Sequence, residues 1–193
     1  MTAPKLIAFA GSTRKGSLNR AVVAAAAEAA SNAGATVELI DLADYEMPIY
    51  NGDLETDSGI PETALALKAK FREADGFIIA SPEYNSAFSP LLKNTIDWCS
   101  RAETDDEPPL AAYSGKTAML LAASPGALGG LRGLYALRTL LQNINVTVFP
   151  DMLAVRSAFD VVGDNGEVTD ERWKAKITSA AKDFVSFASR LSN

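Results

Sequence analysis

A polar loop from Gly11 to Asn19, the first loop, holds residue types that suit a phosphate group. It lies between an apolar run, Leu6 to Ala10, expected to be a buried strand, and an alanine-rich segment, Arg20 to Ala30, expected to be a helix. The first turn of a helix has unpaired N–H groups and a partial positive charge. Arg14 adds a forked cation that fits phosphate oxygens. Short polar side chains come from Ser12, Thr13, Ser17 and Asn19. We therefore predict a phosphate site here, in preference to an ordinary turn.

The spacing of the first loop restricts the kind of phosphate ligand. A dinucleotide fingerprint, G-x-G-x-x-G, needs a glycine where this chain has Thr13. Gly11 and Gly16 have the separation of a nucleoside-triphosphate loop, but Ser17 stands where that loop has its lysine. Without that point charge the loop suits a monophosphate better than a triphosphate. FMN is the obvious candidate among monophosphate cofactors.

Composition excludes several other functions. The chain has 193 residues, enough for one domain spanning 1–193, and a net charge of −6, which argues against nucleic acid or an anionic membrane as a partner. Its single cysteine, Cys99, allows no intrachain disulfide and is compatible with a reducing compartment. Met1 to Pro4 does not begin a secretory signal, and no apolar run approaches the ~20 residues of a spanning helix, so we expect a cytoplasmic protein.

The chain contains no histidine. This excludes Ser-His-Asp and Cys-His catalysis and removes the commonest zinc ligand, so we expect no metal site. We expect an enzyme without histidine to take its chemistry from a cofactor, and we assign no catalytic side chain.

Two further loops follow apolar runs in the same way as the first. The second loop, Ser81 to Ser89, follows Gly76 to Ala80 and contains Tyr84 and Asn85. A tyrosine offers a flat surface and an asparagine a paired donor and acceptor, which suit a heterocycle, although both residues would equally serve a plain turn. The third loop, Ser124 to Gly130, follows the run Lys116 to Ala123. Its glycines permit close approach of a flat ligand, and simple turn chemistry is the alternative.

Apolar runs alternate with helical spacing along the rest of the chain. Thr36 to Asp41 and Thr147 to Val155, the latter interrupted by Pro150, complete five expected strands, and Asp41 is read as a plain strand-end residue. Helices are expected after Arg20, Pro61, Ser89, Gly130 and Asp170. This pattern predicts an α/β, flavodoxin-like three-layer sandwich with a five-stranded parallel sheet in the order 2-1-3-4-5. The first and second loops would then flank the point where the strand order reverses.

Three segments bear on contacts outside the core. Residues 42–60 form a long loop that either walls a cleft or meets a second subunit. The helix after Ser89 is apolar over a wide arc, including Trp98, which predicts a second contact surface, interpreted as a subunit interface. Cys99 on this helix is expected to be a packed thiol, and Arg101 to Pro109 a solvated acidic loop.

Three motifs together resemble the NAD(P)H-dependent FMN reductase family, which includes soluble quinone, chromate and azo-compound reductases. They are Gly-Ser-x-Arg-x-x-Ser-x-Asn, Pro-Glu-Tyr-Asn and Leu-Lys-Asn-x-Ile-Asp-Trp-x-Ser-Arg, and the match runs from Leu6 to about Gly130. The resemblance implies ping-pong hydride transfer from NADPH or NADH, through bound FMN, to a quinone, free flavin or similar acceptor, in a homodimer or homotetramer. It implies cofactor contacts from Ser12, Thr13, Arg14, Ser17, Leu18, Asn19, Pro82, Glu83, Tyr84, Asn85, Ser124, Gly126 and Gly129.

Two other functions stay open from the residues alone. A flavodoxin-type electron carrier would bind FMN without turning over NAD(P)H, and Arg14 in the first loop favours the reductase over it. A phosphate-binding module without flavin would use the same loop. The preference between NADH and NADPH is also open, because Arg14, Lys15 and Arg101 could each meet the extra phosphate or ignore it.

Overall fold

The structure is a computed structural model that describes residues 3–191, so Met1, Thr2 and the last two residues lie outside it. Its centre is a parallel sheet in the order β2-β1-β3-β4-β5, with β6 also paired to β4, which confirms the predicted order. Its strands are β1 (Lys5–Ala10), β2 (Thr36–Leu39), β3 (Gly76–Ala80), β4 (Thr117–Ala123), β5 (Thr147–Val148) and β6 (Leu153–Val155). Ala10 is level with Ala80, and Ala80 with Leu121, so the first three loops leave the sheet at one edge.

The expected fifth strand is present as two short pieces. Both β5 and β6 pair with β4, on either side of Pro150. Proline has no N–H to donate to a ladder, so the strand is interrupted there and resumes at Leu153.

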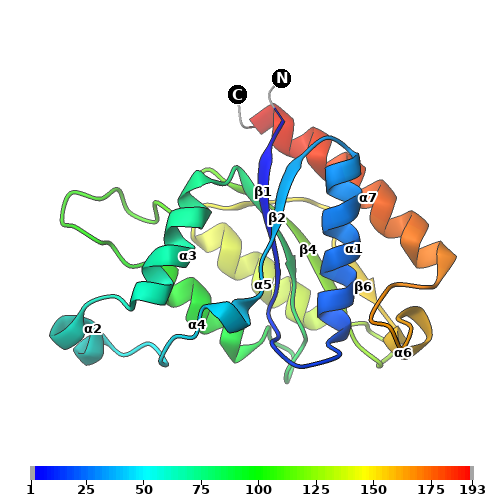
Figure 1. Ribbon diagram of the computed structural model, residues 1–193, viewed down its shortest axis with the longest axis horizontal. Helices are drawn as coiled ribbons and strands as arrows, with labels where there is room; N and C mark the ends of the chain where they lie inside the picture. Colours follow the sequence, from blue (N-terminus) through cyan, green and yellow to red (C-terminus); the bar gives the residue numbers. More distant parts are fainter. Residues whose placement is uncertain (1–2, 192–193) are drawn as a thin grey trace.

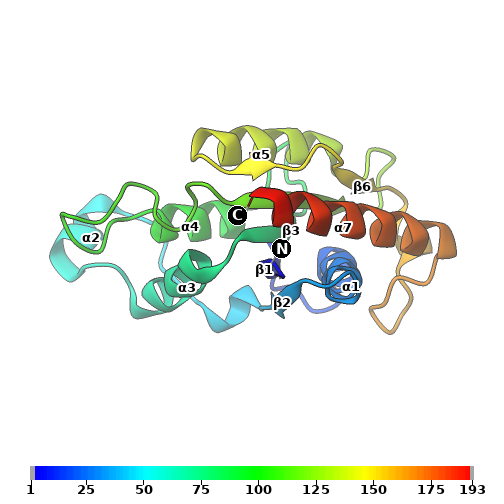
Figure 2. The same ribbon diagram turned by 90° about the horizontal axis from the view of Figure 1, so that it is seen from above.

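Helices cover both faces of the sheet. They are α1 (Leu18–Asn32), α2 (Gly52–Ser58), α3 (Glu62–Glu73), α4 (Pro90–Cys99), α5 (Leu131–Asn143), α6 (Ala158–Val161) and α7 (Glu171–Leu191), with a 3-10 turn at Leu42–Asp44. Along β1, Leu6, Ala8 and Ala10 pack in the core beneath α1 and α7. Ile7 and Phe9 point to the opposite core, beneath α3, α4 and α5. Figures 1 and 2 show these helix layers on the two sides of the strands, which confirms the three-layer sandwich.

Several helix ends follow the signals in the sequence. The Ser89 hydroxyl accepts from the N–H of Leu92 at the start of α4, and Asp170 accepts from the N–H of Trp173 at the start of α7. Helix α1 begins at Leu18, two residues before the expected start, because Ser17 is its cap. At the other end of α7, Leu191 is half exposed.

Residues 42–60 are more ordered than the long loop that was expected. They contain the 3-10 turn and α2, and the stretch from Pro48 to Tyr50 lies against α4. The Trp98 indole donates to the Pro48 carbonyl at 2.7 Å, and the Tyr50 ring meets it edge-on. The interpretation of the Trp98 face as a subunit interface is therefore wrong, since the chain itself covers that tryptophan.

The stretch Arg101 to Pro109 is exposed, as expected of a solvated acidic loop, except at Glu107. Glu107 is buried and accepts from the Lys68 ammonium at 2.6 Å, while Lys68 is fully buried on α3. The burial of Glu107 was not expected, because its partner Lys68 lies 39 positions away in the sequence. Cys99 is buried in the core, as predicted. Within residues 3–191, no helix is long and apolar enough to cross a membrane.

Candidate functional site

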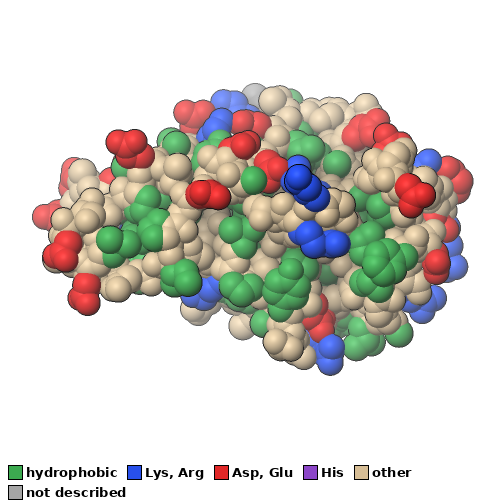
Figure 3. Space-filling view, turned by 60° about the horizontal axis from the view of Figure 1, so that its bottom comes forward, with side chains coloured by type: hydrophobic (Ala, Val, Ile, Leu, Met, Phe, Trp, Pro, Cys, Tyr) green, Lys and Arg blue, Asp and Glu red, His purple; other side chains and the backbone are tan. Residues whose placement is uncertain are grey.

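The three loops meet at the carboxyl edge of the sheet. This edge lies at the bottom of Figure 1, and Figure 3 turns it toward the viewer. Lys and Arg side chains lie near the middle of that face, and acidic ones gather mostly toward its two sides.

The first loop ends at the start of α1, where no acidic side chain offsets the partial positive charge of the helix. Ser17 caps α1 by accepting from the N–H of Arg20, and the first turn carries no acidic side chain. The N–H groups of Leu18 and Asn19 have no partner within the helix, because they belong to its first turn. Arg14 is exposed and donates only to the Gly16 carbonyl, at 3.3 Å, with no carboxylate partner within residues 3–191. This combination suits a monophosphate.

Asn19 joins the first loop to the third. Its amide nitrogen donates to the Ala123 carbonyl at 3.0 Å, and its amide oxygen accepts from the Ala123 N–H at 2.9 Å. Both partners are buried, and Ala123 is the last residue of β4. The Asn19 side chain therefore fixes the start of α1 beside the start of the third loop.

Ser89 joins the first loop to the second. Its hydroxyl donates to the Gly11 carbonyl at 2.6 Å, and its own N–H donates to the Ser81 hydroxyl at 3.4 Å. A Cβ added at Gly11 would lie 2.8 Å from that Ser89 hydroxyl, so the contact needs glycine.

Glu83 joins the second loop to the start of α5. Its carboxylate accepts from the Arg132 guanidinium at 2.8 and 2.6 Å and from the Gly133 N–H at 3.0 Å. Burial raises the pKa of the Glu83 carboxyl, but the Gly133 N–H and the Arg132 guanidinium outweigh it, so its pKa lies below the usual value. Glu83 is therefore an ionised tie between the second loop and α5, and its carboxylate is already hydrogen-bonded.

The second and third loops enclose a hollow of about 440 Å³, the strand-end hollow. Its walls include Asn85, Ser124 and Gly126. Asn85 and Ser86 both have positive φ, at 52° and 67°, in a tight turn closed by two hydrogen bonds between Tyr84 and Ala87. The turn exposes both Tyr84 and Asn85. The volume lies within the range of small-molecule sites.

The remaining predicted residues lie at the same edge but differ in what they offer. Thr13 is exposed, whereas Ser12 is nearly buried, and the Leu18 and Pro82 side chains belong to the packed interior. Gly129 is buried, with φ of 61°, and a Cβ there would lie 2.7 Å from the backbone of Ala154 and Arg156. Its small size is therefore needed for packing against β6.

Sequence reasoning missed Arg132 as part of the site. It lies on α5, 49 positions from its partner Glu83, and no motif marks it. Ser89 was identified only as a helix cap, and its second bond to Gly11 has no local signal.

Comparison with known proteins identifies the family. A model described as NADPH-dependent FMN reductase matches residues 4–160. The quinone reductase of Escherichia coli (strain K12) is 33% identical over 189 residues, which cover 97% of this chain and 96% of that protein. An NAD(P)H-dependent FMN reductase of Pseudomonas aeruginosa is 35% identical over 163 residues, covering 82% and 83% of the two chains.

Solved structures agree with these sequence matches. A Paracoccus denitrificans flavoenzyme described as an NAD(P)H:(acceptor) oxidoreductase superposes with a TM-score of 0.81 at 26% identity, covering 97% of this chain and 98% of that one. An archaeal flavodoxin superposes with a TM-score of 0.61 at 10% identity, a likeness of fold alone. This chain therefore belongs to the NADPH-dependent FMN reductase family and is an oxidoreductase that uses FMN and NAD(P)H.

Proposed function

We propose that this enzyme takes hydride from NADPH or NADH and reduces quinones or similar small acceptors through FMN held at the strand-end edge. The quinone assignment is supported by the Escherichia coli quinone reductase and by a potato NAD(P)H:quinone oxidoreductase that is 33% identical over 195 residues. One structural observation carries the site. The start of α1, where the Leu18 and Asn19 N–H groups have no partner within the helix, lies with the exposed Arg14 at the same sheet edge as the strand-end hollow. Buried hydrogen bonds connect the two.

Each predicted residue has a role in this proposal. The N–H groups of Leu18 and Asn19, the hydroxyls of Ser12, Thr13 and Ser17, and the Arg14 guanidinium would hold the FMN phosphate. The ring system would lie in the strand-end hollow, along Pro82 to Asn85 and beside Ser124, Gly126 and Gly129. Glu83, Gly129 and the Asn19 amide act there by positioning, because their groups already have partners in the fold.

When bound, FMN supplies the redox chemistry, as a hydride acceptor and then as an electron donor. The chain supplies position. The Asn85 amide offers a donor and an acceptor to the edge of a heterocycle, and Tyr84 offers a flat wall. The helix start supplies a fixed positive charge near the phosphate. No side chain is assigned as an acid or base, in keeping with the absence of histidine.

We also propose that the enzyme is a homodimer or homotetramer. Several large apolar side chains are exposed, including Ile49 at 86%, and Tyr84 and Leu128 lie next to the hollow. A second copy would bury such side chains and narrow the hollow. Light scattering after size-exclusion chromatography measures the mass of the particle, and a monomer would overturn this part.

The test is a steady-state assay of FMN-loaded protein with NADPH and a soluble naphthoquinone. We expect parallel lines in double-reciprocal plots, because the oxidised nicotinamide leaves before the quinone binds. Intersecting lines would overturn the ping-pong order. Tight FMN binding without NAD(P)H oxidation would instead identify an electron carrier, and a protein that binds no flavin would be a different kind of phosphate-binding module.

A further inference from the structure

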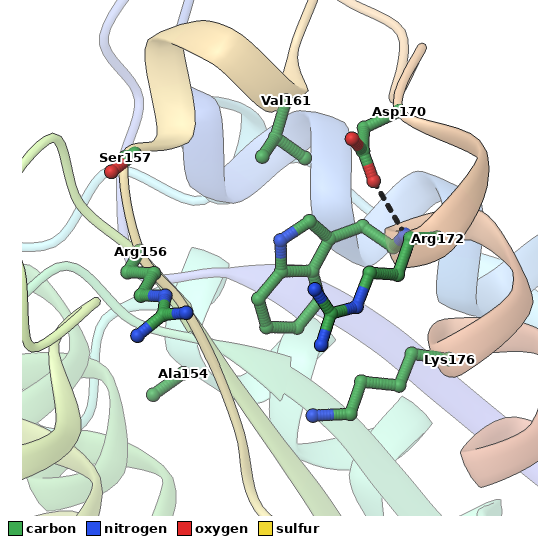
Figure 4. Close-up of a pocket in the computed structure, with 8 residues that line it drawn as sticks. Ala154, Arg156, Ser157, Val161, Asp170, Arg172 and Lys176 are labelled. Carbon is green, nitrogen blue, oxygen red and sulfur yellow. Dashed lines mark hydrogen bonds between the residues drawn. The ribbon is translucent and has the colours of Figure 1, made fainter.

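A second hollow, the basic pocket, lies outside the proposed flavin site. It encloses about 460 Å³ between the end of β6, α6 and the first turns of α7. Three cations line it, Arg156, Arg172 and Lys176, against one carboxylate, Asp170. Figure 4 shows Arg156 on one side, with Arg172 and Lys176 reaching toward it from the other.

The three cations are available to a ligand. None of them has a carboxylate within 4.0 Å among residues 3–191, and all three side chains are exposed. The Asp170 carboxylate is already used, since it accepts from the N–H of Trp173 at 2.7 Å. In a chain whose net charge is −6, such a group of unpaired cations is a positive site that favours an anion.

The pocket also offers a surface for a flat ring. Trp173 lines it and is half buried, and the Lys176 ammonium lies 5.1 Å from the centre of its indole ring. An indole face with a cation beside it suits a stacked heterocycle that carries a phosphate. The volume of the pocket is sufficient for a nucleobase and sugar.

The third loop, which lines the strand-end hollow, packs against the end of β6 and the start of α6, which line the basic pocket. The Ser124 N–H donates to the Val155 carbonyl at 3.1 Å, and the Ala158 N–H donates to the Ser124 carbonyl at 3.1 Å. Gly129 lies against the backbone of Ala154 and Arg156. The basic pocket and the strand-end hollow are therefore neighbours, on either side of this contact.

We propose that the basic pocket binds the adenosine 2′-phosphate end of NADPH and so makes this enzyme prefer NADPH to NADH. Arg172 and Arg156 bind the phosphate, Lys176 adds charge, and Trp173 supports the adenine. This inference rests on the proposed function, because it needs the nicotinamide in the strand-end hollow. The preference for NADPH over NADH then depends on Arg156, Arg172 and Lys176 and not on Arg14, Lys15 or Arg101.

Calorimetry on the FMN-loaded protein tests the pocket without turnover. The probes are adenosine 2′,5′-bisphosphate, adenosine 5′-monophosphate and inorganic phosphate. We expect the bisphosphate to bind at least about tenfold more tightly than either of the other two, since two arginine contacts to one phosphate are strong. Equal binding of the two nucleotides would overturn the proposal, and so would inorganic phosphate binding as tightly as the bisphosphate.

The double variant R172Q/K176Q removes two of the cations, and Lys182→Gln is its control, a charge loss farther along the exposed side of the same helix. We expect the double variant to weaken the bisphosphate at least about tenfold and to raise the ratio of KM for NADPH to KM for NADH. If the double variant and the control bind the bisphosphate with the same affinity, the assignment of the basic pocket is wrong. The proposed function still stands in that case, provided that the wild type oxidises NADPH. If the wild type oxidises neither nicotinamide, the proposed function itself fails.

Discussion

Asn19 and Ala123 form a reciprocal pair, in which one side-chain amide both donates to and accepts from the backbone of a single residue 104 positions away. The pair joins the first helical turn of the chain to the end of the central strand β4. Two further contacts do the same for the second loop. Ser89 joins it to Gly11 of the first loop, and Glu83 joins it to Arg132 of α5. The loops are therefore placed by the fold before a ligand binds.

Asn19→Ala is expected to loosen both the fold and the proposed cofactor site. It leaves the buried N–H and carbonyl of Ala123 without partners, which costs about 1–3 kcal/mol. The midpoint of thermal unfolding should fall by about 2–10 °C, and FMN should bind more weakly. Asn32→Ala, at the exposed end of the same helix, is the control. An unchanged midpoint and unchanged flavin affinity would show that the pair positions nothing.

Arg14→Ala should weaken FMN without affecting riboflavin. The guanidinium has no carboxylate partner among the residues that the structure describes, so its removal costs the fold little, while a lost charged contact to phosphate costs about 1.5–3 kcal/mol. That corresponds to about ten- to a hundredfold in the FMN dissociation constant. Quenching of flavin fluorescence measures both ligands, and Lys15→Ala is the neighbouring control. Equal losses for FMN and riboflavin would remove Arg14 from the phosphate site.

Glu83→Gln should reduce stability in a way that depends on pH. The folded-state pKa of Glu83 is depressed, so its contribution is present above the unfolded-state value, near 4.5, and is lost as the pH falls through the folded-state value. We expect the variant to be about 1–2 kcal/mol less stable at pH 7 and the difference to shrink in acid. Denaturant unfolding at several pH values measures this, with the exposed Glu28→Gln as control. A difference that does not change with pH would contradict the ion-pair role.

Cys99 should be inert in the folded enzyme. Burial raises the pKa of its thiol to about 12, and the thiolate is the reactive form. An aromatic disulfide reagent should therefore react with the native protein only as fast as the protein unfolds, and at once in guanidinium. A Cys99→Ala variant that folds should keep its NAD(P)H oxidoreductase activity. Rapid labelling of the native protein would contradict the core position.

The sequence predicts the elements of this fold better than the ties between them. Strands such as β3 are short apolar runs bounded by turn residues, and Ser89 and Asp170 are local capping signals, so spacing alone identifies them. The tie between Glu83 and Arg132 depends on how loops pack across the sheet edge, and no periodicity encodes it. The contact of Pro48 with Trp98 and the burial of Glu107 against Lys68 were not predicted for the same reason, because both join residues far apart in the sequence.

The buried pair of Lys68 and Glu107 gives the last prediction. Lys68 donates to Glu107 at 2.6 Å and to the Arg101 carbonyl at 2.7 Å, so it secures the acidic segment to α3. Removing Lys68 leaves the buried Glu107 carboxylate with only the Glu103 N–H and Arg72, 3.8 Å away, and K68M alone should cost about 3–5 kcal/mol. The double variant K68M/E107L replaces both charges with apolar groups, and much of the lost stability should return.

A double-mutant cycle in urea measures the coupling between the two residues. Burial raises the pKa of Glu107, but Lys68 outweighs this and holds that pKa below its usual value, so the stability that the pair provides is present above pH ~4.5 and is lost in acid. The wild type should therefore lose more stability than the double variant when the pH is lowered from 7 to 3. If the two single losses simply add, the lysine and the carboxylate act independently, and the segment from Arg101 to Glu107 is held by something other than this ion pair.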